Sequence, residues 1–354
     1  MSPEPAATQD FDCLVRAVQS NCDISDARHA RDLTLCTYLL AMREFYRWES
    51  GMPFSEKLAK ADVGAWIARR EALWETIEEA EYVDLPLRGR THDRFAAGEV
   101  NAVLASRGLV YGAGIGRFGK PLFFLGHLSR DERREDARIL VSGREYARDL
   151  SPFPAALLGD TIYLRQESLE RWLWEKIETW GVRKPGGALR EVLDAYRFDV
   201  DPHSAVEQMV EAESQTLILH ELGELEAGKL LGGEWEEMCG GFSGRRAEML
   251  ARAVRDNLAD CLVTLPALLE RNAIASIHFW FSNFEGMRRE LFPRMACAYD
   301  CWSSGGDLCP LSGAIQAGQE HWREVALQLL ASHRNGGNSE ATIESLIASP
   351  EIHL

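Results

Sequence analysis

The sequence lacks the features by which membrane-spanning and exported proteins are recognised. The closest approach to an apolar span, PLFFLGHL at residues 121–128, is far too short to cross a bilayer, so no membrane partner is expected. The opening residues, MSPEPAATQDFD, contain no apolar core of the kind found in signal peptides. The eight cysteines are scattered, and without an export signal we expect reduced thiols in a cytoplasmic protein.

Basic residues are scarce as well. The 354-residue chain has 39 lysines and arginines against 55 acidic residues, which gives a formal net charge of -16. No run of basic residues is longer than a pair such as Arg133–Arg134. Because so acidic a surface repels phosphate backbones, nucleic acid is not an expected partner, and we expect a small-molecule or peptide substrate instead.

Several catalytic and cofactor motifs are missing or out of place. There is no GxSxG nucleophile elbow. Gly114, Gly116 and Gly119 have the GxGxxG spacing of a dinucleotide site, but Pro121 and a strand-like apolar run follow where a helix should begin. These glycines therefore predict a hairpin turn. The cysteines at 297, 301 and 309 do not form a CxxC-like knuckle and are interpreted as structural thiols.

The hydrophobic pattern predicts an α+β fold that is predominantly helical, with a small central β-sheet. Ser25 or Asp26 is expected to cap a helix that runs to about Glu49, and further helices are expected over 61–82 and 93–108. Strands are expected within 109–128, 137–143 and 160–166, and helices again after them. We expect an N-terminal helical region over 1–106, the sheet with its backing helices over 107–200, and a C-terminal helical region over 201–354 that carries the site.

One expected helix carries the functional argument. Asp201 and Pro202 mark its start, and residues 204–228 contain six glutamates but no lysine or arginine. At about 100° per residue, Glu213, His220 and Glu224 fall within an arc of about 40°. Leucines surround most of the helix, which predicts burial. Buried carboxylates need a cation, so the pattern indicates one divalent metal ion or, alternatively, arginines from the region of Arg245 to Arg255.

The string LILHELGE, residues 217–224, resembles the active-site helix of zincin metallohydrolases, whose motif is HExxH. The resemblance implies that His220 is a metal ligand and that Glu221 is the general base. It departs from the motif at Glu224, which stands where the second histidine would be. Carboxylates bind zinc, and also iron or manganese, so the expected cofactor is one divalent ion with zinc favoured.

The third metal ligand is expected from a later helix. Glu248 is the first candidate, with Asp256 and Asp260 behind it, and Glu213 is a further possible ligand. The sequence thus predicts a metal-dependent hydrolase with an HExxE helix.

Two other functions fit the same residues. A di-metal carboxylate oxygenase or oxidase would add ligands such as His278, although the sequence contains no Glu-x-x-His element. A non-enzymatic helical interaction protein would instead dock its acidic helix on a basic partner. In that protein Glu213 and Glu224 would point at solvent.

Two charged segments remain outside this argument. Arg144, Glu145 and Arg148 follow an expected strand and could line a pocket or form a salt-bridged turn. Arg43, Glu44 and Arg47 invite the same two interpretations. The segments that contain them, CTYLLAMREFYRWE (36–49) and ILVSGREYARDL (139–150), are similar to an uncharacterised family of bacterial cytoplasmic proteins with no established activity.

Overall fold

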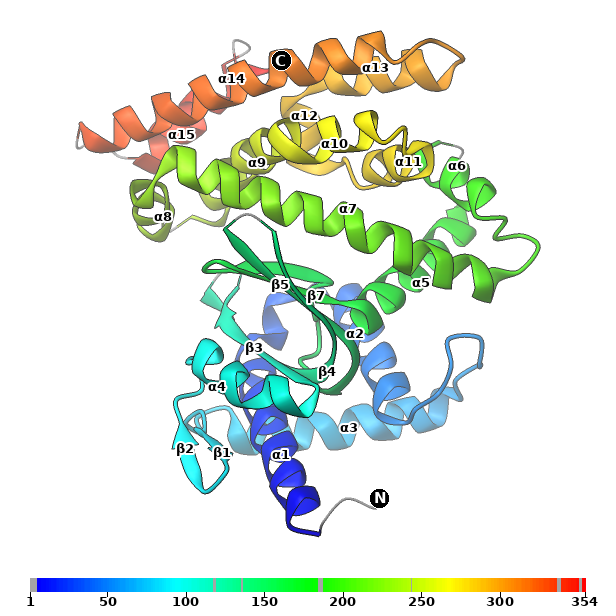
Figure 1. Cartoon of the computed structure of the whole chain (residues 1–354), viewed down its shortest axis with the longest axis vertical. Coiled ribbons are helices and arrows are strands. Elements are labelled where there is room, and N and C mark those ends of the chain that lie inside the picture. The colour runs from blue at the N-terminus through cyan, green and yellow to red at the C-terminus, as the bar shows by residue number, and fades with distance from the viewer. Residues whose placement is uncertain are drawn as a thin grey trace. The chain divides into compact units, whose positions relative to one another are not determined.

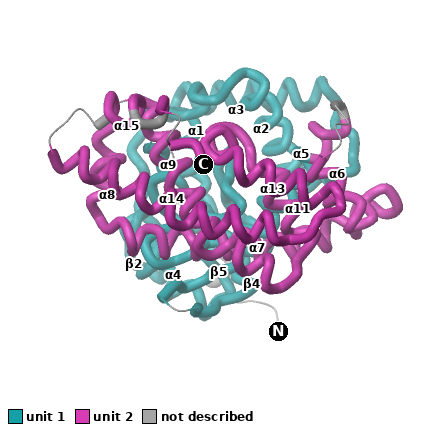
Figure 2. Tube along the Cα trace, turned by 90° about the horizontal axis from the view of Figure 1, so that it is seen from above, with its two compact units in different colours: residues 1–176 teal, residues 177–354 magenta. Residues whose placement is uncertain are grey.

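The computed structural model describes residues 5–116, 119–134, 136–183, 187–242, 244–335, 339–349 and 352–354. Contacts divide the chain into two compact units, residues 1–176 (unit 1) and 177–354 (unit 2), shown in Figure 2. The three regions expected from the sequence divide the chain by type of element rather than by contact, and they stay a prediction. None of the described helices combines the length and the apolar character that a membrane span requires.

Unit 1 contains the strands. Its elements are α1 (Pro5–His29), α2 (Leu35–Glu49), α3 (Lys60–Ile77), β1 (Leu85–Leu87), β2 (Arg90–His92), α4 (Ala97–Leu104), β3 (Leu109–Ile115), β4 (Pro121–Arg134), β5 (Ala137–Ala147), β6 (Ala155–Leu158), β7 (Thr161–Arg165) and the start of α5 (Gln166–Arg183). The main sheet has the order β3-β4-β5-β7-β6 (Figure 1). Only β5 and β7 pair in parallel among its strands. With the helices around it, this sheet confirms the predominantly helical α+β fold.

The expected hairpin is confirmed in its strands. β3 and β4 pair antiparallel, with Leu109 opposite His127 and Ile115 opposite Pro121. Residues 117 and 118, at the expected turn, lie outside the described residues. Register shifts between Leu125 and Arg130 then bend β4 against β5. Gly126 permits this bend, because a Cβ there would lie 3.0 Å from the backbone oxygen of Arg144.

The expected helix start at Ser25 or Asp26 is wrong. Both residues are buried near the end of α1, which packs on β4 and β5 through apolar residues such as Leu14 and Val18. The following helix, α2, begins one residue after Thr34, whose side chain accepts a hydrogen bond from the Thr37 backbone N–H. The sequence did not predict α1 because its first residues are polar. Its apolar face is stabilised only by packing on the sheet.

Unit 2 is helical throughout its described residues. Its elements are α6 (Ala188–Ala195), α7 (Pro202–Leu231), α8 (Gly233–Gly240), α9 (Arg245–Ala259), a π-helical segment (Asp260–Thr264), α10 (Leu265–Glu270), α11 (Ile274–Ser282), α12 (Gly286–Leu291), α13 (Pro293–Ser303), α14 (Cys309–Arg334) and α15 (Ser339–Ile347). Figure 1 shows α7 beside α9, with α14 on the other side of α9. Trp235, Phe292 and Trp322 are among the large side chains of the core between them.

Helix α7 begins and ends where the sequence predicted. The carboxylate of Asp201 accepts a hydrogen bond from the Ser204 backbone N–H, and Pro202 occupies the first turn. Gly232, with φ 71°, ends the helix. The helix therefore presents His220 and Glu224 in its C-terminal half, against α9 and the π-helical segment.

Candidate metal centre

His220 and Glu224 lie one turn apart on α7 and face the same way, as their spacing predicted. The Nε2 atom of His220 is 3.6 Å from Oε1 of Glu224. The side chains are 23% and 17% exposed, so one edge of this pair reaches the surface. Most of the surface of the pair is therefore protected from water.

Helix α9 adds Asp256 to the pair. One possible ligand atom from each of His220, Glu224 and Asp256 lies within 4.8 Å of the other two. Asp256 is only 7% exposed, and its Oδ1 has no hydrogen-bond donor within the described parts of the chain. Burial raises the pKa of this carboxyl, and the negative charge of Glu224 raises it further. Asp256 thus brings an unpaired carboxylate oxygen to the group.

Asp260 fixes the orientation of the histidine ring. The Nδ1 atom of His220 lies 2.9 Å from Oδ1 of Asp260, and a carboxylate accepts, so Nδ1 carries the hydrogen. Arg288 from α12 holds the other oxygen of Asp260. The second ring nitrogen, Nε2, is left facing Glu224. A carboxylate behind a histidine in this way is the usual outer-sphere support of a metal-binding imidazole.

The pKa values in the group follow from its charges. Burial by itself would lower the pKa of His220, but the carboxylates of Asp260 and Glu224 outweigh it and hold that pKa well above its usual value. Burial would raise the pKa of Glu224, but His220 and Arg255 outweigh it and lower that pKa. Burial would likewise raise the pKa of Asp260, which Arg288 and His220 lower instead.

The charges leave one carboxylate unmatched. Arg255 donates to Oε2 of Glu224 at 3.0 Å, and Arg288 pairs with Asp260. Two guanidinium groups therefore face the carboxylates of Glu224, Asp256 and Asp260, and Arg255 is also shared with the exposed Glu236 at 3.0 Å. A proton on His220 or a bound divalent cation can balance the remaining negative charge. Arg255 was among the arginines that the sequence offered as neutralising groups, and Arg288 was not.

A close approach of two backbones makes this arrangement possible. A Cβ on Gly223 would lie 2.4 Å from the backbone oxygen of Ala259, so only glycine fits between His220 and Glu224 at this distance. The π-helical segment begins at the next residue, Asp260. Such a segment adds a residue to one turn and changes the direction of the side chains around it, and it is frequent at functional sites.

The other predicted site residues lie apart from this group. Glu213 is completely buried and accepts hydrogen bonds from the hydroxyls of Tyr196 (2.9 Å), Thr216 (2.7 Å) and Ser276 (3.1 Å). Burial raises its pKa. Glu248 pairs with Arg252 at 3.3 Å on its own helix. It precedes Asp256 by eight residues, about 12 Å along α9, and so is not brought to His220.

Glu221 is 7% exposed and follows His220 by about 100° around α7. It is not one of the three grouped side chains. His278 lies with its Nδ1 2.8 Å from the Tyr299 hydroxyl and stacks on Trp302. Since Glu213 is buried and Glu224 is largely so, neither points at solvent as a docking helix requires.

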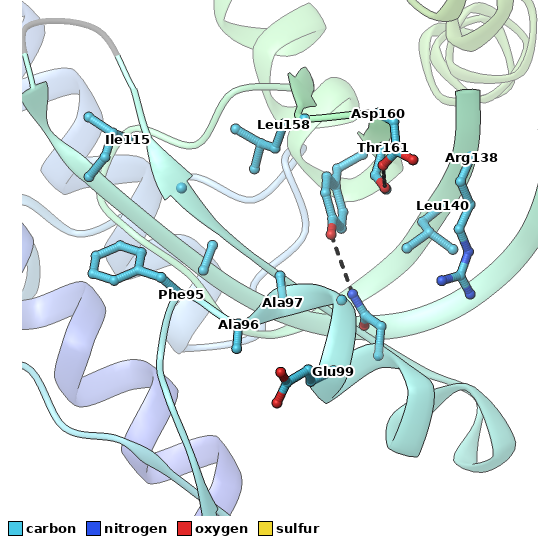
Figure 3. A pocket seen from close by; sticks show the side chains of 16 residues that line it. Phe95, Ala96, Ala97, Glu99, Ile115, Arg138, Leu140, Leu158, Asp160 and Thr161 are labelled. Atoms are coloured by element: carbon cyan, nitrogen blue, oxygen red, sulfur yellow. Dashed lines mark hydrogen bonds between the residues drawn. The ribbon is translucent and has the colours of Figure 1, made fainter. Parts of the chain in front are cut away.

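Unit 1 contains a separate cavity of about 530 Å³. It lies where α4 begins, beside the end of β3, the start of β5 and the β6–β7 turn. Figure 3 shows Phe95, Ile115 and Leu158 on one side of it and Arg138 and Leu140 on another. None of the site residues predicted from the sequence lines this cavity.

Family models match the chain in two pieces. Residues 13–165 match the N-terminal domain, and residues 170–350 the C-terminal domain, of a family of unknown function, DUF6866. The boundary between the two matches falls in the first turns of α5, close to the division between the two units. No curated protein and no solved structure matches the chain significantly.

Proposed function

Since the chain belongs to the DUF6866 family, whose two domain models name no activity, we propose its function from the site alone: a metal-dependent hydrolase. His220, Glu224 and Asp256 hold one divalent cation in this proposal. The observation that carries it is the buried, unpaired Oδ1 of Asp256 beside a histidine and a second carboxylate. An unpaired buried carboxylate is costly, and a cation is the most compact partner for it.

The donor set suits zinc and also harder divalent ions. It offers one imidazole nitrogen and two carboxylate oxygens, which is the number of protein ligands in a catalytic zinc site that keeps one position for water. The 3.6 Å between His220 Nε2 and Glu224 Oε1 is close to the ligand–ligand separation of about 3.3 Å that tetrahedral bonds of about 2.0 Å require.

Neighbouring residues fix the orientation of two of these ligands, His220 and Glu224. Asp260 holds Nδ1 of His220, so Nε2 is directed into the group. Arg255 occupies Oε2 of Glu224, so Oε1 is the oxygen left for a metal. Both contacts remove the freedom that a ligand would otherwise lose on binding.

The hydrolytic step rests on the resemblance to zincins. A divalent ion held there would lower the pKa of a water, and Glu221 would serve as the general base for it. The exposed edge of His220 and Glu224 admits a small-molecule or peptide substrate. We keep a bacterial, cytoplasmic setting as part of the proposal.

The geometry favours this proposal over its alternatives. Within the described residues, His220, Glu224 and Asp256 form the one group that could hold a metal ion, whereas a di-metal oxygenase needs ligands for two. Glu213 and His278, which the oxygenase would use, are engaged with hydroxyls elsewhere in unit 2. The interaction protein is disfavoured because Glu213 and Glu221 are buried in this helix and Glu224 is only 17% exposed.

Metal analysis combined with hydrolysis assays tests the proposal. We expect one zinc per purified chain, and zinc-dependent cleavage within a panel of peptide and p-nitrophenyl ester substrates. E221Q should keep the metal and lose the cleavage, whereas the control E226Q, at an exposed glutamate paired with Lys229, should keep both. Cleavage retained by E221Q would reject its role as base. If the purified chain binds no metal, the proposed hydrolase is refuted. Two irons per chain together with substrate-dependent oxygen uptake would favour the oxygenase.

A further inference from the structure

Unit 1 contains a second concentration of buried charge, with three arginines. We call it the buried arginine cluster; it consists of Glu145, Arg148, Asp149, Arg165 and Arg171. β5 ends at Ala147, just before Arg148; Arg165 ends β7, and Arg171 lies in the second turn of α5. The sequence had marked Arg144, Glu145 and Arg148 without a role for them.

The cluster contains donors that nothing in the described residues satisfies. Arg148 is 1% exposed, and its Nε and Nη2 have no hydrogen-bond acceptor in the part of the chain described. The same is true of Nε of Arg171 and Nη2 of Arg165. Since an unpaired buried donor costs about 1–3 kcal/mol, and more when it is charged, these atoms need an acceptor that the described residues do not bring within hydrogen-bond distance.

The nearby carboxylates do not reach Arg148, although Oε2 of Glu145 and both oxygens of Asp149 also have no hydrogen-bond donor among the described residues. Oε1 of Glu145 accepts from Arg165 at 2.7 Å and from Ser168 at 2.6 Å, and its Oε2 stays 4.0 Å from Nη1 of Arg148. Asp149 faces Lys120 at 3.7 Å and Arg165 at 3.9 Å. Arg171 donates to Glu175 at 2.8 Å. Arg148 therefore has no carboxylate of its own within hydrogen-bond distance.

The Arg148 guanidinium lies over aromatic rings. Its Cζ lies 5.0 Å from the ring centre of Trp48 and 5.7 Å from that of Phe45, both on α2. Burial, and then the positive charge of Arg171, lower the pKa of Arg148 to about 10. Two cations close enough to repel each other in this way would be stabilised by an anion.

Nε and Nη2 of Arg148 are the two donors with which an arginine side chain binds an oxyanion side-on. Nε and Nη2 point in the same direction and match the two oxygens of a carboxylate or phosphate. Arg138 in the same unit shows this use, because its Nε and Nη2 donate to the two oxygens of Asp131 at 3.1 and 2.7 Å. In Arg148 the equivalent pair has no oxyanion from the described chain.

We propose that the Nε–Nη2 edge of Arg148, with Arg171 as a second cation, binds the oxyanion group, a carboxylate or a phosphate, of a small ligand. This site belongs to unit 1 and uses none of the residues of the metal centre. Its test is therefore independent of the proposed hydrolase.

Thermal unfolding of the full chain in different anions tests the site. Inorganic phosphate or acetate, compared with chloride at equal ionic strength, should raise the Tm by about 3 °C or more at about 100 times its Kd. The anion that acts identifies the ligand group as phosphate or carboxylate. R148M should abolish the shift and leave the Tm in chloride unchanged or higher, because it replaces an unpaired buried charge by an apolar side chain of similar length.

R138M is the matched control, because Arg138 lines the open cavity and already has its oxyanion in Asp131. It should keep the shift. R171M should weaken anion binding about tenfold or more and tests the site even if R148M does not fold. The proposal is overturned if neither anion shifts the wild-type Tm, if R148M or R171M responds like the wild type, or if R138M alone loses the response.

Discussion

Replacing Gly223 by alanine tests the close contact on which the metal centre is built. The new Cβ would lie 2.4 Å from the backbone oxygen and 2.9 Å from the carbonyl carbon of Ala259. Both atoms are backbone, so no side chain can turn away to relieve the overlap. Helices α7 and α9 must separate by about 1 Å to restore ordinary contact, which is the kind of backbone shift that overpacking forces.

Gly228 on the same helix supplies the control. A Cβ there meets nothing within 4 Å, so G228A should stabilise the protein by about 0.5–1 kcal/mol through helix propensity alone. G223A gains the same amount but also carries an overpacking cost of about 1–3 kcal/mol. The free energies of unfolding of the two variants should therefore differ by about 1–3 kcal/mol, with G223A the less stable.

Urea unfolding followed by circular dichroism measures this difference, and zinc titration measures its effect on the site. His220 and Glu224 lie on either side of Gly223, so G223A should also weaken zinc binding by about tenfold, as a loss of ligand positioning does. Equal stability of G223A and G228A would refute the close contact. Unchanged zinc affinity in a destabilised G223A would show that the metal, if bound, does not depend on this contact.

Three further predictions concern unit 2. D260N should lower zinc affinity about 10–100-fold, measured by competition with a chelator, because it removes the negative charge behind His220; equal affinity would reject that support. E213A should cost about 1–3 kcal/mol in urea unfolding, because it leaves buried hydroxyls such as that of Thr216 without an acceptor, while zinc affinity stays the same; a loss of zinc binding would make Glu213 a ligand after all. Burial lowers the pKa of His278, so the unfolded chain binds its proton more readily, and the contribution of His278 to stability should fall as the pH drops from about 7 to about 5, against the opposite contribution of groups with a raised pKa such as His220. H278Q should remove this contribution, so the variant should lose less stability, or gain more, than the wild type between about pH 7 and about pH 5, and an unchanged slope in denaturation curves would contradict it.

The sequence predicted the helices and strands whose position is set by residues close to them in the chain. Asp201, Pro202 and Gly232 mark the ends of α7, and short apolar runs rich in β-branched and aromatic residues mark β5 and β7. The edge strand β6 was not predicted, because AALL at 155–158 has a composition typical of a helix and becomes extended only by pairing with β7. The β1–β2 hairpin was missed too, although Arg88 and Gly89, with φ 52° and 70°, form its turn.

The candidate site was half predictable. The i,i+4 spacing of His220 and Glu224 places them on one face whatever surrounds the helix. The turn of α9 that meets them depends on how two helices pack, and the sequence contains no direct record of that, so Glu248 was preferred over Asp256. Gly223 was the available signal, since a glycine inside a buried helix marks the point where another backbone comes close. Arg288 comes from α12 and could not be foreseen by periodicity.

Zinc titration calorimetry on the chelator-treated wild type and on D256N tests the central claim most directly. The wild type should bind one zinc per chain, and D256N should bind it more than about 100-fold more weakly. D256N should still be folded and at least as stable without metal, because it removes a buried carboxylate that Glu224 repels. If the wild type binds no zinc, manganese or iron, or if D256N binds as tightly as the wild type, His220, Glu224 and Asp256 are a protonated charge network and not a metal centre.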